Sequence, residues 1–307
     1  MKLYRLTGLA LLVPLSMAGQ QVSDDDFRFA NANPAFASNQ GPRVCIDEGH
    51  HNFHTADGRY KPFADLLRGD GYTVAGFSGA FTDEDLAGCG LLVIANPLAE
   101  ENVTDWSYPH PSAFAKEEIR ELMVWIRAGG RLLLFADHAP IAGAARDLGA
   151  VLGLVMIDAY VDAVPGATDV FQVSDGTLRP HRILEGRAPF ERVNSVTTFT
   201  GQAVQITGGW TPLFVFGPEA VARISLSQVF QDGAFAEWPQ FPVGGWVHGA
   251  VREWDRGRMV FLGEAAMCSA QVSGEERYPM GMNHPEAPQN AQFCLSVVRW
   301  LTGVLDR

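Results

Sequence analysis

The sequence is short of positive charge and lacks the local motifs of nucleotide-binding and zinc enzymes. Its 307 residues carry 23 Lys and Arg against 35 Asp and Glu, which gives a formal net charge of −12. Nucleic acids and anionic membrane surfaces are bound through basic patches, so neither is expected as the main partner. No Gly-x-Gly-x-x-Gly or P-loop motif occurs, so no nucleotide cofactor is implied. The HExxH motif and paired CxxC spacings are missing too.

Long apolar runs are also missing. No stretch approaches the roughly 18 uninterrupted apolar residues of a spanning helix. Residues 9–15 are a short apolar run after Lys2 and Arg5, and the small residues of 16–18 follow it. This layout predicts a signal peptide over 1–18, with an uncleaved anchor or a buried N-terminal helix as alternatives. We therefore expect a periplasmic or secreted protein with no membrane span after cleavage.

The composition is that of a packed globular protein, with 47% hydrophobic and 19% charged residues. Four cysteines, Cys45, Cys89, Cys268 and Cys294, allow three pairings into two disulfides. We favour Cys45–Cys89, which neighbouring strands bring together, and Cys268–Cys294, which flank the last loop and helix. Four buried free thiols are the alternative.

Short apolar runs alternate with amphipathic helical patterns through much of the chain. Unbroken apolar strands between such helices are typical of a parallel sheet covered on both faces. The expected strands are 43–47, 72–75, 91–95, 131–136 and 258–263, and the expected helices are 60–68, 114–128 with Ser112 as N-cap, 144–152 and 290–301. The pattern therefore predicts an α/β fold with a doubly wound, mostly parallel sheet.

Residues 169–253 follow a different pattern, with short β-type runs between Gly and Pro turns. We expect this β-rich insertion to extend the sheet in antiparallel fashion or to cap it. Residues 19–41 are polar and aperiodic, which predicts an extended lead-in. Residues 42–307 are then expected to form a single domain.

Several motifs resemble one known superfamily when they are taken in order. They are DEGHHNFHT after the first strand, then LLVIANP, GGRLLLFADH, GRMVFLGEAAM and QNAQFCLSVVRWL. This order resembles the class I glutamine amidotransferase-like superfamily, and within it uncharacterised exported branches, which implies a flavodoxin-like core. Catalytic members place a Cys in a Gly-x-Cys-x-Gly elbow. The corresponding turn here, residues 135–139, reads Phe-Ala-Asp-His-Ala, so glutamine hydrolysis is not implied.

Polar side chains follow several of the expected strands. In open α/β sheets, ligands bind beyond the carboxyl ends of the strands, and charges placed there are costly to bury unless paired. The residues at these ends are Asp47, Glu48, His50, His51, Asn52, Asn96, Asp137, His138 and Glu264, with Asn283, His284 and Asn290 in later segments. The sequence thus predicts a polar site at this edge, with Asn52, Asn96, Asn283 and His284 binding substrate.

Three interpretations of this convergence stay open. In the first, His50, Asp137 and His138 hold a divalent ion such as Zn or Mn, and Glu48 or Glu264 is the general base. In the second, one of those two glutamates shares proton transfer with His50 or His138 without a metal. In the third, the residues form a polar network without turnover, because a fold does not imply a function.

Two functional hypotheses follow. The first is an exported hydrolase of a small carbohydrate or ester-type substrate, whose catalytic residues are Glu48, His50, Asp137, His138 and Glu264. The second is a non-catalytic periplasmic ligand-binding or scaffolding module. Both bind a small molecule or carbohydrate.

Overall fold

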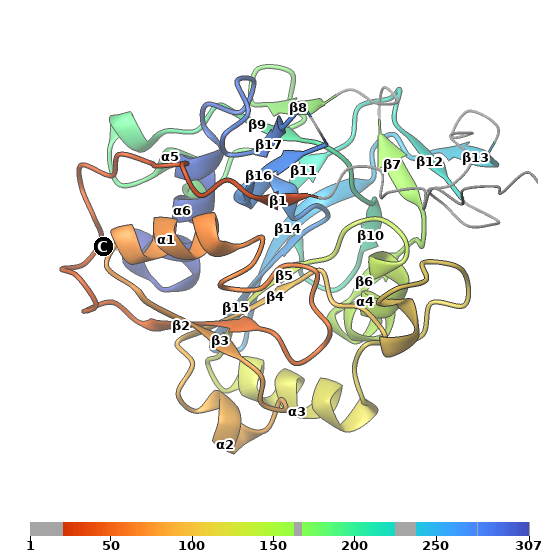
Figure 1. Cartoon of the computed structure of the whole chain (residues 1–307), viewed down its shortest axis with the longest axis horizontal. Helices are drawn as coiled ribbons and strands as arrows, with labels where there is room; N and C mark the ends of the chain where they lie inside the picture. Colours follow the sequence, from red (N-terminus) through yellow and green to blue (C-terminus); the bar gives the residue numbers. More distant parts are fainter. Residues whose placement is uncertain (1–20, 163–167, 225–237, 275, 307) are drawn as a thin grey trace, which may run out of the picture.

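The computed structural model describes residues 21–162, 168–224, 238–274 and 276–306, and its main feature is a nine-stranded sheet (Figure 1). The predicted signal peptide over 1–18 lies outside these residues. Five strands of the sheet are parallel and stand in the order β3-β2-β4-β5-β15. They are β2 (Arg43–Asp47), β3 (Thr73–Phe77), β4 (Leu91–Ala95), β5 (Arg131–Phe135) and β15 (Gly257–Leu262). Counted along the chain this order is 2-1-3-4-5, as in flavodoxin-like sheets.

Helices pack on both faces of the parallel strands. The helices are α1 (Lys61–Gly69), α2 (Asp83–Leu86), α3 (Lys116–Arg127), α4 (Ile141–Leu152), α5 (Arg182–Glu185) and α6 (Asn290–Leu301). Strand residues alternate between two cores: Leu91 and Val93 of β4 pack in the core with α1 and α6, and Leu92 and Ile94 pack in the core with α3 and α4. Among the described residues, no helix is long and apolar enough to cross a membrane.

The β-rich insertion continues the sheet in antiparallel fashion, which was one of the two expectations. Next to β15 come β14 (Val247–Trp254), β10 (Val204–Ile206) and β6 (Leu154–Met156), and β11 (Thr211–Val215) also pairs with β14. Smaller sheets are formed by β7 (Tyr160–Asp162), β12 (Val221–Arg223) and β13 (Gln240–Pro242), by β8 (Asp169–Gln172) and β9 (Ser195–Thr198), and by β1 (Val22–Ser23), β16 (Ala270–Ser273) and β17 (Tyr278–Gly281). Short 3-10 helices are η1 (Glu100–Asn102), η2 (Pro189–Glu191), η4 (Ala266–Cys268) and η5 (Val304–Asp306).

Most predicted elements of the α/β part are found within a few residues of their expected bounds. The strands over 43–47 and 91–95 and the helix over 290–301 match to the residue. The prediction of Ser112 as an N-cap is wrong, because α3 begins at Lys116 with Ala115 in the cap position. The Ser112 hydroxyl instead accepts a hydrogen bond from the backbone N–H of Phe114 at 3.2 Å.

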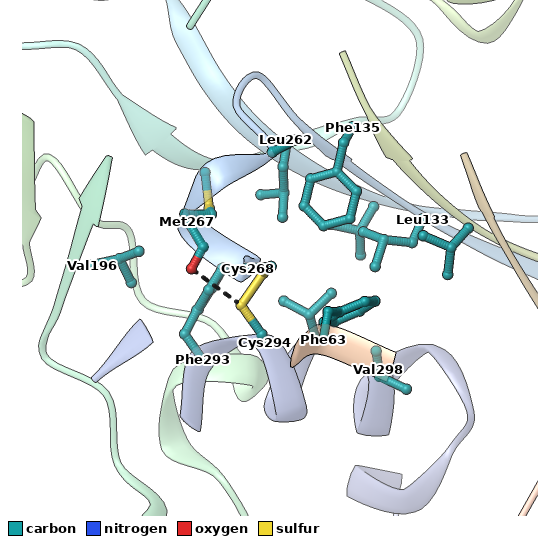
Figure 2. Close-up of a cluster of buried hydrophobic side chains, with 14 of the residues drawn as sticks. Phe63, Leu133, Phe135, Val196, Leu262, Met267, Cys268, Phe293, Cys294 and Val298 are labelled. Carbon is teal, nitrogen blue, oxygen red and sulfur yellow. Dashed lines mark hydrogen bonds between the residues drawn. A yellow bond between two sulfur atoms is a disulfide. The ribbon is translucent and has the colours of Figure 1, made fainter. Parts of the chain in front are cut away.

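Both favoured disulfides are confirmed, so the alternative of four free thiols is wrong. Cys45 pairs with Cys89, and Cys268 pairs with Cys294. Figure 2 shows the second disulfide among apolar side chains that include Phe63, Phe135 and Leu262. It joins η4, which follows β15, to the closing helix α6, so the last loop is fixed to the core covalently.

A buried ionic cluster holds the N-terminal lead-in against the end of the chain. Arg299 of α6 has no exposed surface, and its guanidinium lies 2.6 Å from Oδ1 of Asp70 and 3.0 Å from Oε1 of Glu191. Asp70 also accepts hydrogen bonds from the Asn31 side chain at 2.7 Å and from the backbone N–H of Ala35 at 2.8 Å. The extended segment is therefore fixed by charge-assisted hydrogen bonds.

Candidate functional site

The ends of β4 and β5 lie side by side, and the Asn96 side chain makes two hydrogen bonds between them. Asn96 follows β4, and its Oδ1 accepts from the backbone N–H of Asp137, which comes just after β5, at 3.2 Å. In return, Nδ2 of Asn96 donates to Oδ2 of Asp137 at 3.4 Å. Asn96 has a φ of 53°, a left-handed conformation that asparagine tolerates better than most residues. The side chains of Asn96 and Asp137 therefore form one hydrogen-bonded pair at the two strand ends.

The carboxylate of Asp137 is held by three donors. Besides the Asn96 amide, the backbone N–H of His138 donates to Oδ1 at 2.8 Å, and the Thr200 hydroxyl donates to the same oxygen at 3.2 Å. The residue is only 6% exposed. These three hydrogen bonds fix the direction of the Asp137 side chain.

The ring of His138 is held by a hydrogen bond from Nδ1. Its Nδ1 lies 2.7 Å from the carbonyl oxygen of Ala139, and a carbonyl can only accept, so Nδ1 carries the hydrogen. In the neutral ring Nε2 then has the lone pair, and this atom lies 3.9 Å from Oδ1 of Asp137. The ring stacks on Tyr160 with a centroid distance of 4.0 Å. Nε2 of His138 and the Asp137 carboxyl group thus lie close together beside the Tyr160 ring.

Asn96, Asp137 and His138 line a cavity of about 450 Å³ at the carboxyl edge of the sheet. Its polar lining includes His54, Asn96, Asp137, His138, Thr200 and Gln271. Its aromatic lining consists of Phe53, Trp106, Tyr160 and Phe199. Cavities with apolar walls and a few convergent polar groups are the usual form of small-molecule sites. Of the predicted site residues, Asn96, Asp137 and His138 are thus brought together.

His54 and Gln271 were not predicted as site residues, although both line the cavity. His54 is 2% exposed, and burial together with the charge of Arg59 lowers its pKa to about 3, so the ring is neutral. The Nε2 amide of Gln271 lies 3.5 Å from Nε2 of His54. Nδ1 of His54 and Oε1 of Gln271 have no hydrogen-bond partner within the described part of the chain. Histidine in a loop and glutamine in a strand carry no motif, so sequence reasoning had no signal for this pair.

Glu264 is fully buried and is not part of the cavity lining. Its Oε2 accepts a hydrogen bond from the backbone N–H of Met267 at 2.8 Å, which fixes the turn at η4. Burial raises the pKa of the Glu264 carboxyl well above its usual value, and the negative charge of Asp137 raises it further. This residue supports the loop after β15 from inside.

Glu48 and His50 lie apart from the cavity lining and fill structural roles. Oε1 of Glu48 accepts from the backbone N–H of Ala56 at 2.9 Å, which closes the loop after β2. His50 lies between two carboxylates, with Nδ1 2.9 Å from Asp47 and Nε2 3.4 Å from Glu118. Burial lowers the pKa of His50, but the two carboxylates outweigh it, so the pKa is raised above 6.5.

The remaining predicted substrate-binding residues also make internal contacts outside the cavity lining. Asn52 is 7% exposed, and its Oδ1 accepts from the backbone N–H of His50 at 3.2 Å. Nδ2 of Asn283 donates to Asp24 and to the carbonyl of Gln271, both at 2.9 Å. Nε2 of His284 lies 2.9 Å from the Tyr278 hydroxyl.

The three predicted metal ligands do not form one donor set. Asp137 and His138 line the cavity, whereas His50 is bound between Asp47 and Glu118. Over residues 21–162, 168–224, 238–274 and 276–306, no group of three or more His, Cys, Asp or Glu side chains is arranged to hold a metal ion.

A second cavity of about 550 Å³ lies over the β-rich insertion and is more open to solvent. Glycines and prolines such as Gly217, Pro218 and Gly244 make much of its lining. It contains none of the predicted site residues, and its charged groups are limited to Asp175 and Arg179. The convergence of buried polar groups is therefore a property of the first cavity.

Comparison with known proteins shows a likeness in fold only. No family model matches the sequence, and no curated protein matches it. Among solved structures, the mmIFT52 N-terminal domain is 15% identical, with a TM-score of 0.56 over 85% of this chain and 97% of that one. A ThuA-like protein from Bacteroides uniformis is 13% identical, with a TM-score of 0.43 over 89% and 94%. A ThuA-like protein from Parabacteroides merdae is 10% identical, with a TM-score of 0.46 over 86% and 90%.

Proposed function

We propose that the protein is an exported hydrolase of a small ester whose alcohol part is a carbohydrate, with His138 as general base. The observation that carries this proposal is the fixed tautomer of His138, whose Nδ1 donates to the Ala139 carbonyl at 2.7 Å. Nε2 is then the basic atom of a residue that lines the cavity. The carboxylate of Asp137, 3.9 Å from Nε2, stabilises the imidazolium that forms.

The proposed reaction needs only water and these two side chains. A water molecule gives a proton to Nε2 of His138 while its oxygen bonds to the ester carbonyl carbon. The tetrahedral intermediate then breaks its bond to the alcohol oxygen. The imidazolium returns the proton to that leaving oxygen, which yields a carboxylic acid and an alcohol.

The walls of the cavity favour a neutral, hydroxyl-bearing ligand. Phe53, Trp106, Tyr160 and Phe199 offer flat apolar faces of the kind on which sugar rings pack. The neutral His54 and the amide of Gln271 add uncharged polar groups to the same lining.

An ester fits this site better than a glycoside does. Glycosidases use two carboxyl groups that flank the scissile bond. Asp162 is the second carboxylate in the cavity lining, but it is in an ion pair with Arg223. A single base beside one fixed carboxylate matches the needs of water attack on an ester.

Two further features of the chain belong to this proposal. Both pairs of cysteines are in disulfides, which persist in oxidising compartments, so a signal peptide over 1–18 and a periplasmic or secreted location fit the chain. We also place the chain in an exported branch of the class I glutamine amidotransferase-like superfamily that lacks the nucleophilic Cys, with a flavodoxin-like doubly wound core. The Phe-Ala-Asp-His-Ala turn after β5 and the 2-1-3-4-5 order of its parallel strands support that placement.

The proposal is tested with the purified mature protein on p-nitrophenyl acetate and on acetylated xylose. We expect turnover in the wild type and a loss of about 10²-fold or more in His138→Ala and Asp137→Asn, with circular dichroism spectra that still show a folded protein. The matched control is His181→Ala, since His181 caps α5 and does not line the cavity. Turnover should also survive dialysis against EDTA, because His50 does not join the other two predicted ligands.

The second candidate is a ligand-binding module without turnover. It is favoured by the three donors that already occupy the Asp137 carboxylate. Under this candidate, the wild type would hydrolyse neither ester, but titration calorimetry would detect binding of xylose or its acetate. Trp106→Ala would weaken that binding, since Trp106 lines the cavity.

A further inference from the structure

The loop that supplies Trp106 to the cavity wall is folded around one buried asparagine. This loop follows η1 and has no regular secondary structure over 105–110. Nδ2 of Asn102 donates toward the carbonyls of Asp105, Ser107 and Pro109 at 3.0, 3.1 and 3.3 Å. Asn102 therefore holds the inside of the loop on both sides of Trp106.

His110 makes further contacts that hold this loop, and both of its ring nitrogens face acceptors. Nδ1 lies 2.7 Å from Oδ2 of Asp158, and Nε2 lies 3.0 Å from the carbonyl oxygen of Trp106. A carboxylate and a carbonyl can only accept, so both bonds form only when both nitrogens carry a hydrogen. The geometry is thus that of an imidazolium, and the residue is 4% exposed.

The groups around His110 favour this charged form. Burial lowers the pKa of His110, as does the positive charge of Arg146. The hydrogen bond to Asp158, its charge and the Trp106 carbonyl outweigh both, so the pKa is raised above 6.5. The Tyr108 ring stacks on the imidazole with a centroid distance of 4.1 Å. The Tyr108 hydroxyl donates a hydrogen bond to the backbone carbonyl of Asp158 at 3.0 Å.

Asp158 is itself fixed to the scaffold of the cavity. Its Oδ1 accepts from the backbone N–H of Gly143, in the first turn of α4, at 3.1 Å. The chain from Asp158 runs directly into β7, whose first residue is Tyr160, the residue that stacks on His138. His110 therefore joins the Trp106 loop to the segment that positions the proposed base.

We propose that His110, as an imidazolium, is the positioning residue that holds Trp106 in the cavity wall, so that Trp106 keeps its place while His110 is protonated and is released when His110 loses its proton. A neutral imidazole has one N–H and must give up one of its two bonds. The bond to the charged Asp158 is the stronger one, so the bond to the Trp106 carbonyl is lost. That this release also lowers ester turnover rests on the proposed function.

The experiment follows Trp106 directly by ¹⁹F NMR of protein labelled with 5-fluorotryptophan. Trp106→Phe assigns its resonance. In the wild type we expect this resonance to shift between pH 5 and 9 with a midpoint above 6.5. In His110→Gln the part of the shift that comes from His110 should be lost, and any shift that remains comes from His138, whose ring centroid lies 6.1 Å from that of Trp106. His181→Gln should titrate like the wild type.

A second variant keeps the test valid if His110→Gln does not fold. Asp158→Asn retains the ring but removes the charge, so the midpoint should fall by about one pH unit or more. A Trp106 resonance that is constant over pH 5–9 in the wild type, or a midpoint unaltered in Asp158→Asn, would overturn the inference.

Ester turnover measured over the same pH range separates the two proposals. Titration of the Trp106 resonance without turnover would leave the role of His110 intact and refute the hydrolase. Turnover with a constant Trp106 resonance would do the reverse.

Discussion

Replacing Arg299 with methionine should destabilise the protein far more than its loss of one charge suggests. The guanidinium has no exposed surface and bridges Asp70 and Glu191 at 2.6 and 3.0 Å. Methionine fills similar space but leaves the buried Asp70 carboxylate without its cation, whereas Glu191 keeps its ion pair with Arg187. Removal of one partner from a buried ion pair costs about 3–5 kcal/mol of unfolding free energy.

A matched surface pair gives the control. Nε of Arg127 lies 2.6 Å from Oδ2 of Asp255, but the two side chains are 52% and 48% exposed. Exposed pairs contribute about 0–1 kcal/mol, so Arg127→Met should change the free energy of unfolding little. The two variants make the same chemical change at the same contact distance, and they differ in burial.

Urea unfolding followed by circular dichroism, with the disulfides intact, measures both free energies. The double variant Asp70→Asn/Arg299→Met should lose less than the sum of its single variants, because both single changes break the same ion pair. A loss in Arg299→Met no larger than in Arg127→Met would refute the reasoning. It would mean that the lead-in and α6 are held together by apolar contacts alone.

Three further predictions concern other parts of the fold. The double change Cys45→Ser/Cys89→Ser opens a loop of 44 residues and should lower the free energy of unfolding by about 2–4 kcal/mol, measured by urea unfolding against wild type with both disulfides formed. Gly257→Ala places a Cβ 2.0 Å from a backbone carbonyl of α3 and should cost about 1–3 kcal/mol in thermal unfolding, whereas Gly217→Ala, with no atom within 4 Å, should cost little. The raised pKa of His50 means that its ionic contribution to stability is present below pH 6.5 and is lost as the pH rises through its folded pKa. The stability difference between wild type and His50→Asn should therefore shrink from pH 6 to pH 9, and a constant difference would contradict the assignment.

The parallel part of the fold could be predicted because its signals are local. Strands such as 91–95 are unbroken apolar runs, and Gly129-Gly130 comes just after α3. Hydrophobic periodicity and helix-ending glycines therefore indicate these elements directly. The insertion was harder, because β10 and β12 are three residues long and their partners lie far along the chain. Short strands carry little pattern, and what they pair with is a tertiary property.

The site was predicted in part, for a related reason. Asp137 and His138 follow a central strand, whose carboxyl end faces the ligand edge of the sheet, so position alone singled them out. The same rule selected Glu48 and His50, but it does not say which way a side chain turns after the strand ends. Glu48 turns back onto its own loop, and His50 turns toward α3. The residues Gln271 and Trp106 come from segments that tertiary contacts alone bring to the cavity.

The pairing of β1 with β16 has a consequence for the order in which the protein is built. Val22 lies opposite Val272, and the neighbouring Gln21 is part of the cavity wall. During synthesis, β1 cannot pair with β16 until some 250 more residues have been made. The parallel strands β2 to β5 can form much earlier, since their contacts lie closer in sequence. The part of the cavity wall at Gln21 can therefore form only after most of the chain has been made.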